Sequence, residues 1–202
     1  FVQVTSSPKS LLDPEVRLNP YADHQGWGQL REPLLRITAL WRAFDVSSES
    51  GTYRYWNPDH TLAQAALRSP SVFNFFEPEY RQPGEIDLAG VFSPEFQITN
   101  ESTAISVANT LYVAIYRGIA WGENQLQLDL EEAYTLADDL PAFLDQLDLL
   151  FYHGSMPSDL RNLILARAEA YERPYDLEEE ARRRIQLVLY LAITAPEAAV
   201  LR

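Results

Sequence analysis

The sequence predicts a mainly α protein: an irregular helical bundle with a long loop excursion rich in aromatic residues and proline. Several segments repeat apolar residues three or four positions apart, which is the pattern of amphipathic helices. Most of these segments begin with Ser, Asp or Asn close to a proline and end at Gly or Pro, which are helix-boundary signals. Between residues 45 and 98, proline and glycine recur too often for long regular elements.

These signals define the expected organisation. We expect residues 1–202 to form a single helical region, with an aromatic, loop-rich segment over 45–98 and a helical bundle over 99–202. The chain starts with Phe1 rather than Met, which predicts a processed or excised fragment of a larger protein. Any targeting segment is then expected upstream.

The composition is that of a globular protein, with 47% hydrophobic and 22% charged residues. The formal net charge of −13 repels phosphate backbones, so the sequence argues against a nucleic-acid partner and against binding to anionic lipid surfaces. No apolar run approaches the roughly 20 residues that a membrane-spanning helix needs. Cysteine is absent, which removes disulfides, thiolate nucleophiles and zinc–thiolate sites.

The first convincing helix is expected over residues 31–44. Pro33 suits its first turn, because the first helical position needs no backbone N–H donor. Three prolines within residues 1–21 leave room there only for brief turns. The residues expected on the apolar stripe of the 31–44 helix are Leu34, Ile37, Trp41 and Phe44.

Two elements of lower regularity follow. We expect a loop over residues 45–60, and then a short helix over 61–68. A Ser-Pro pair at 69–70 ends that helix, because the residue before a proline avoids the helical conformation.

A longer helix is expected over residues 100–117. Asn100 (or Thr99) is a suitable N-cap, and Gly118 stands at the position that follows many helices. The residues expected on its buried stripe are Ile105, Ala108, Tyr112 and Ile115.

Four helical segments complete the bundle. Ser155 and Pro157 are expected to start the third of them, and Asp176 with Glu179 resembles a capping box for the fourth. In the fourth, three glutamates precede three arginines by four residues, which is the favourable order for ion pairs along a helix. The expected segments are a short helix within 126–137, then 140–152 ending at Gly154, 155–171 and 177–193.

Recognisable catalytic and ligand-binding motifs are missing. His24, His60 and His153 have no partner at metal-ligand spacing, so no metal site is predicted. Gly154 and Ser155 lie outside the G-x-S-x-G pattern, and both have helix-boundary roles. No Gly-rich phosphate loop or dinucleotide fingerprint occurs, so no cofactor is predicted.

The informative anomaly is the stretch 53–96, which holds nine of the 24 aromatic residues. Phe73, Phe75 and Phe76 are expected to give this irregular stretch a small core of its own. Alternatively, aromatic side chains on proline-stiffened loops form a rigid surface that loses little entropy on binding a sugar or a peptide. The residues that we single out as candidate binding residues are Phe73, Asn74, Phe75, Tyr80, Arg81, Glu95 and Gln97.

A second chemistry open to this stretch is carboxylate catalysis. Glu77, Glu79 and Glu95 lie among aromatic residues, and apolar surroundings raise the pKa of a carboxyl group toward that of a general acid. With 29 acidic residues in the chain, the sequence alone does not select a catalytic pair.

The run over residues 69–84, Ser-Pro-Ser-Val-Phe-Asn-Phe-Phe-Glu-Pro-Glu-Tyr-Arg-Gln-Pro-Gly, resembles a signature of the bacterial family catalogued as domain of unknown function 1800. So do Ser-Pro-Glu-Phe-Gln-Ile at 93–98 with Asn-Glu-Ser at 100–102, Leu-Arg-Glu-Pro-Leu at 30–34, and Tyr-Leu-Ala-Ile-Thr-Ala-Pro-Glu at 190–197. The last block departs from the family pattern, with Ala195 in place of serine and Ala198 where an aromatic residue is common.

The resemblance implies that the chain is the C-terminal part of such a protein and that a longer N-terminal helical region precedes it. It also implies a bacterial protein that is exported or belongs to the cell envelope. The family brings no established activity and no catalytic residues. The expected partners are therefore the missing N-terminal region, another protein or a glycan.

Two functions follow as hypotheses. The leading one is a structural or binding module that uses the aromatic segment for intramolecular packing or for contact with a partner or a glycan. The alternative is a carboxylate-dependent hydrolase that acts on an extracellular polymer through Glu79, Glu95 or another acid pair.

Overall fold

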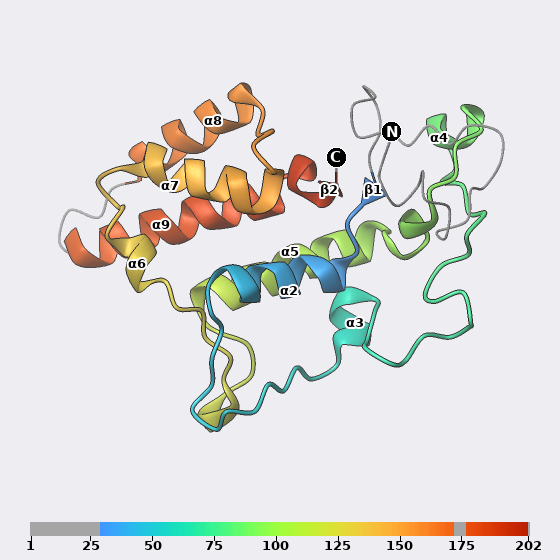
Figure 1. The fold of residues 1–202 in the computed structure, drawn as a ribbon, viewed down its shortest axis with the longest axis horizontal. Helices are drawn as coiled ribbons and strands as arrows, with labels where there is room; N and C mark the ends of the chain where they lie inside the picture. Colours follow the sequence, from blue (N-terminus) through green and yellow to red (C-terminus); the bar gives the residue numbers. More distant parts are fainter. Residues whose placement is uncertain (1–28, 172–176, 202) are drawn as a thin grey trace.

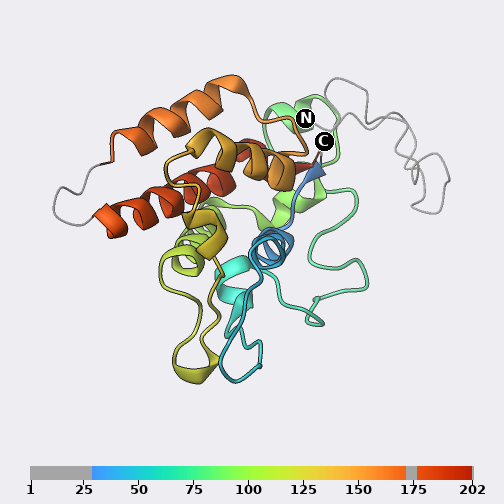
Figure 2. The ribbon, with the colours of Figure 1, turned by 60° about the vertical axis from the view of Figure 1, so that its left-hand side comes forward.

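Helix α9 (Leu177–Thr194) lies at the centre of the computed structural model, which describes residues 29–171 and 177–201. It packs against α5 (Glu101–Tyr116) on one side and against α7 (Leu140–Leu147) and α8 (Ser158–Glu169) on the other. Figures 1 and 2 show α9 between the α7–α8 pair and the α5–α2 pair. The predicted mainly α fold is confirmed.

The other elements are short, apart from α2 (Pro33–Ala43). A two-residue strand near each end of the described chain forms the antiparallel pair β1–β2, with Leu30 opposite Val200. The short elements are β1 (Gln29–Leu30), α3 (Pro58–Leu62), α4 (Glu85–Leu88), η1 (Pro94–Ile98), η2 (Gly122–Asn124), α6 (Glu131–Tyr134), η3 (Asp148–Tyr152), η4 (Pro196–Ala199) and β2 (Val200–Leu201).

The core is built where α9 meets its neighbours. Its largest side chains with almost no exposure include Phe143 and Phe151, from α7 and η3. The helix predicted over 31–44 is present as α2, and all four residues of its predicted stripe pack on this core. Further core residues are Val107, Leu111, Ile185, Val188, Leu189 and Ala192.

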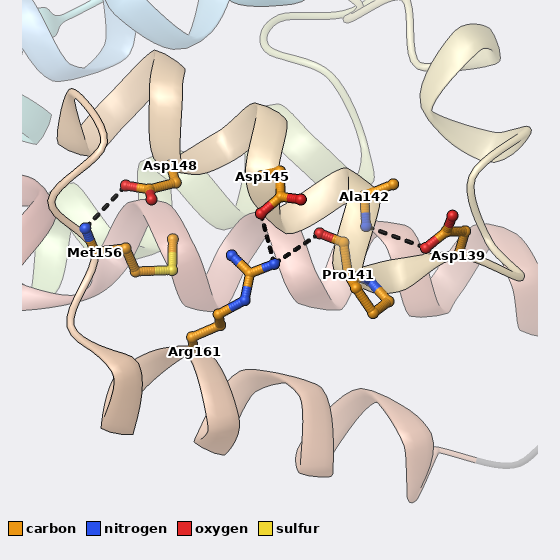
Figure 3. Close-up of polar contacts among 7 residues, drawn as sticks. All are labelled: Asp139, Pro141, Ala142, Asp145, Asp148, Met156 and Arg161. Carbon is orange, nitrogen blue, oxygen red and sulfur yellow. Dashed lines mark hydrogen bonds and ion pairs between the residues drawn. The ribbon is translucent and has the colours of Figure 1, made fainter.

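Polar contacts fix α8 against α7 (Figure 3). The Arg161 guanidinium donates to the Pro141 carbonyl at 2.9 Å and forms an ion pair with Asp145 at 2.7 Å. The Asp148 carboxylate accepts a hydrogen bond from the Met156 backbone N–H at 2.8 Å, across the turn that joins the two helices. These polar contacts, together with apolar packing, determine the position of α8 relative to α7.

Several predicted boundaries hold because their signals are local. Asn100 caps α5 and forms a capping box with Thr103. Gly118 follows α5 with φ +78°, and a Cβ there would lie 2.8 Å from the Leu126 carbonyl oxygen, so only glycine fits. All three glutamate–arginine pairs of α9 form, at 178–182, 179–183 and 180–184. Asp176 of the predicted capping box lies outside the described residues.

The buried stripe predicted for the 100–117 helix is wrong in its orientation. Ile105 is 64% exposed and Tyr112 is 39% exposed, whereas Ile115 is buried as expected. Apolar residues occur on most sides of this helix, so the partner decides which side is buried. The side that faces α9 and α3 carries Val107, Thr110, Leu111 and Ala114.

Two other predictions need correction. The short helix lies at Pro58–Leu62 rather than at 61–68, because Ala63 adopts a left-handed conformation with φ +55° and ends it. Ser155 is not the N-cap of α8; Pro157 holds that position, and the Ser155 hydroxyl donates instead to the Tyr152 carbonyl at 2.6 Å. The segment predicted over 140–152 is α7 followed by one π-helical stretch, η3.

Candidate functional site

The aromatic segment folds back on itself before the start of α5. The Ser93 N–H donates to the Tyr80 carbonyl, and the Ser93 hydroxyl accepts from the Gln82 N–H, both at 2.8 Å. The Glu77 N–H donates to the Gln97 side-chain oxygen at 2.6 Å. Residues 77–82 are therefore held beside residues 93–97, although residues 77–82 contain no helix or strand.

The first turn of α5 forms the other side of the site. The Asn100 side chain accepts from the Thr103 N–H at 3.0 Å, and the Thr103 hydroxyl accepts from the Asn100 N–H at 2.8 Å. The Thr103 hydroxyl also lies 2.8 Å from the Ile98 carbonyl, to which it donates. This reciprocal capping fixes the angle between η1 and α5.

An open groove with a volume of about 770 Å³ lies between these two parts. It combines two aromatic rings with amide, hydroxyl and carboxylate groups. The Gln82 side-chain oxygen accepts from the Tyr80 hydroxyl at 3.0 Å, and the Gln97 side-chain oxygen accepts from the Glu77 N–H. Within the described residues, neither amide nitrogen has a hydrogen-bond partner, so both can donate to a ligand. Its lining residues are Tyr80, Gln82, Pro83, Phe96, Gln97, Thr99, Asn100, Glu101, Ser102 and Ala104.

Of the seven predicted binding residues, Tyr80 and Gln97 line this groove. Arg81 is adjacent in sequence but has internal partners: its guanidinium lies over the Phe92 ring, 4.7 Å from the centroid, and 3.9 Å from an Asp87 carboxylate oxygen. Arg81 thus holds the loop together through Phe92 and Asp87.

Phe73, Asn74 and Phe75 lie in a separate tight turn. Asn74 has φ +72°, and its N–H donates to the Ser71 carbonyl at 3.3 Å. Phe73 is 59% exposed, and Phe75 and its neighbour Phe76 are half-buried, so the expected phenylalanine core does not form. A turn this short leaves no layer of chain to cover the rings. The three candidate residues are not among the groove lining.

Glu95 has a structural position instead. It is 5% exposed, and its carboxylate accepts a hydrogen bond from the Gln29 side chain. This contact fastens the aromatic segment to β1. Glu77 and Glu79 are exposed, and within the described part of the chain no hydrogen bond joins either side chain to Glu95.

Sequence reasoning missed Gln82, Phe96 and Glu101 as groove residues. Phe96 was visible as part of the aromatic stretch, and Glu101 follows the predicted N-cap directly. No local signal indicated that the first turn of α5 would face residues 80–83, because that proximity depends on the backbone hydrogen bond between Ser93 and Tyr80.

Among residues 29–171 and 177–201, no three His, Asp or Glu side chains gather as metal ligands would. Over the same residues, no helix is both long and apolar enough to cross a membrane. Comparisons of the chain with protein-family models, curated proteins and solved structures find no match in any of the three. The resemblance to the domain of unknown function 1800 therefore stays a prediction.

Proposed function

We propose that the chain is a non-catalytic binding module that holds a glycan in the groove between residues 80–83 and the first turn of α5. The observation that carries this proposal is the lining of the groove. Tyr80 and Phe96 offer ring surfaces against which the apolar face of a sugar packs. The amide nitrogens of Gln82 and Gln97 donate to sugar hydroxyls, and the carboxylate of Glu101 accepts from them.

The groove also has the stiffness that a binding site for a flexible polymer needs. Hydrogen bonds from Ser93 to Tyr80 and from Thr103 to Ile98 hold its two sides in place. Preformed sides reduce the entropy lost when a chain of sugars binds. An open groove, unlike an enclosed cavity, leaves room for a polymer to continue past the site at both ends.

Cosedimentation with insoluble cellulose, chitin and peptidoglycan tests the proposal. We expect the protein to sediment with at least one of these polymers. Tyr80→Ala is expected to weaken binding about tenfold, because central aromatic residues carry a large share of such binding energies. Circular dichroism is expected to show unchanged helicity, since Tyr80 lies outside the helical core.

Trp121→Ala is the matched control. Trp121 is 81% exposed but lies before η2, outside the groove, so its loss is expected to leave sedimentation unchanged. Equal losses for the two variants would indicate non-specific aromatic adsorption. Failure of the wild-type protein to sediment with any of the three polymers would end the glycan proposal.

The hydrolase alternative has no observation in its favour at this site, because Glu95 is buried against Gln29 and Glu79 is exposed. One assay on the same polymers distinguishes a hydrolase from a non-catalytic binding module. Release of new reducing ends by the wild type, lost in Glu95→Gln or Glu79→Gln, would support a hydrolase.

A further inference from the structure

A second cavity, of about 260 Å³, lies where the start of α2, the first turns of α5 and the end of α9 meet. Its surface is mainly apolar, with contributions from Pro33, Val107 and Pro196. Arg31 and Arg36 also line it. Packing of the three helices does not require two cationic side chains in a mainly apolar cavity.

Neither arginine has a carboxylate partner within the described residues. Arg31 is 9% exposed, and its guanidinium lies 3.4 Å from Nε2 of His153. Arg36 donates to the Ile193 carbonyl at 2.8 Å, while its buried Nε has no hydrogen-bond partner among residues 29–171 and 177–201.

Two acidic residues on segments that line the cavity, Glu32 and Glu95, are already engaged. Glu32 accepts a hydrogen bond from the Gln64 amide, and Glu95 accepts one from the Gln29 amide. Arg184 offers the useful contrast. Its Nε is also buried without a hydrogen-bond partner in the described part of the chain, but its guanidinium pairs with Glu180.

Two like charges close together without a carboxylate partner among the described residues are unfavourable. Burial lowers the pKa of both guanidinium groups, and the charge of Arg31 lowers the pKa of Arg36 further. Arginine nevertheless stays protonated in proteins. A bound anion would relieve both the mutual repulsion and the unmet hydrogen-bonding capacity.

The cavity also limits which anion fits. The hydroxyls of Thr99, Thr103 and Thr194 donate to backbone carbonyls, so the guanidinium groups are the donors left for a ligand. Apolar walls disfavour a strongly hydrated ion such as phosphate and favour an apolar body attached to the charged group. A planar carboxylate matches the fork of guanidinium donors.

We propose that this cavity binds a small organic carboxylate, with the charged group at Arg31 and Arg36 and a short apolar body against Pro33, Val107 and Pro196. The site is separate from the glycan groove and does not depend on it. The carboxylate is either that of a free small acid or that of a polypeptide C-terminus, since both present the same planar anion.

Thermal unfolding of the whole chain with added butyrate, benzoate or N-acetyl-alanyl-alanine tests this assignment, with sodium chloride at equal ionic strength as the reference. We expect one of these carboxylates to raise Tm by about 3 °C at roughly ten times its Kd. The largest response to butyrate or benzoate identifies a free acid. The largest response to N-acetyl-alanyl-alanine, with none to its C-terminal amide, identifies a polypeptide end.

Arg36→Met removes the charge and keeps the apolar stem. It is expected to raise Tm in the absence of ligand and to abolish the carboxylate-dependent shift. The matched control is Arg161→Met, which removes another partly buried arginine but one that pairs with Asp145. That variant is expected to lower Tm and to keep the carboxylate shift.

Three results would overturn the proposal: no shift beyond sodium chloride for any carboxylate, an equal shift in Arg36→Met, or a larger shift with inorganic phosphate. A measurement on the wild type alone guards against misfolding of the variant. Crystals soaked in 4-bromobenzoate are expected to show the bromine anomalous signal in this cavity, and a signal only elsewhere would refute the assignment.

Discussion

The surroundings of a single side chain in this protein depend on residues that lie far away in the sequence. Glu95 illustrates this, because its carboxylate accepts a hydrogen bond from Gln29, 66 residues earlier. The aromatic residues around Glu95 indicate a candidate binding residue, but nothing local in the sequence distinguishes an anchoring carboxylate from a ligand-binding one. Tyr80 and Gln97 were predictable as groove residues because they share a short stretch that folds onto itself.

A cluster of tyrosines between α5 and α9 predicts how the stability of the protein depends on pH. Tyr112 and Tyr116 stack with ring centroids 4.5 Å apart, and Tyr190 meets both rings edge-on. Burial, and after it the neighbouring Tyr112, raises the pKa of Tyr116 to about 12. The folded protein therefore keeps the Tyr116 proton at a pH where the unfolded chain has lost it.

Between about pH 10 and 12 the unfolded state binds fewer protons than the folded state, so the stability present below pH 10 falls as pH rises. Tyr116→Phe is expected to make this fall less steep. Urea unfolding at a series of pH values from 9 upward measures it, and an identical slope in both proteins would contradict the raised pKa.

At the level of elements, both ends of α5 were predictable, whereas its buried face was not. Asn100 and Gly118 act within a few residues of the ends of α5, so their signals are readable in the sequence. The buried side of α5 depends on α9 and α3, which are non-local. The pairing of β1 with β2 is non-local too, and two residues per strand leave no recognisable alternation.

The N-cap of α5 supports both the helix and the groove beside residues 80–83. Asn100→Ala removes the acceptor for the Thr103 N–H and is expected to lower the free energy of unfolding by about 1 kcal/mol. Ser158→Ala, at the exposed first position of α8, is the control and is expected to change stability little. Chemical denaturation compares the two variants. Equal stability of Asn100→Ala and the wild type would show that the cap is not needed.

For the molecule as a whole, the core and the aromatic segment contribute differently to stability. Phe143 has no exposed surface in the core between α7 and α9, whereas Phe73 is 59% exposed. Phe143→Ala is expected to lower the free energy of unfolding by roughly 3–5 kcal/mol through lost burial and a cavity. Phe73→Ala is expected to cost less than about 0.5 kcal/mol.

Thermal and urea unfolding of both variants measures this contrast. Comparable destabilisation by the two substitutions would mean that the phenylalanines at 73–76 form a supporting core in solution after all. A small effect of Phe143→Ala would contradict the central position of α7 in the packing.

The short β1–β2 ladder has an engineering consequence. Because Gln29 lies opposite Leu201 in this ladder, the two ends of the described chain lie next to each other. A domain whose two ends lie side by side can be inserted into a surface loop of another protein without separating the residues that flank the insertion. Joining the two strands by a new linker and opening the chain elsewhere, for example near the exposed Trp121, would give a permuted protein with the same helix packing.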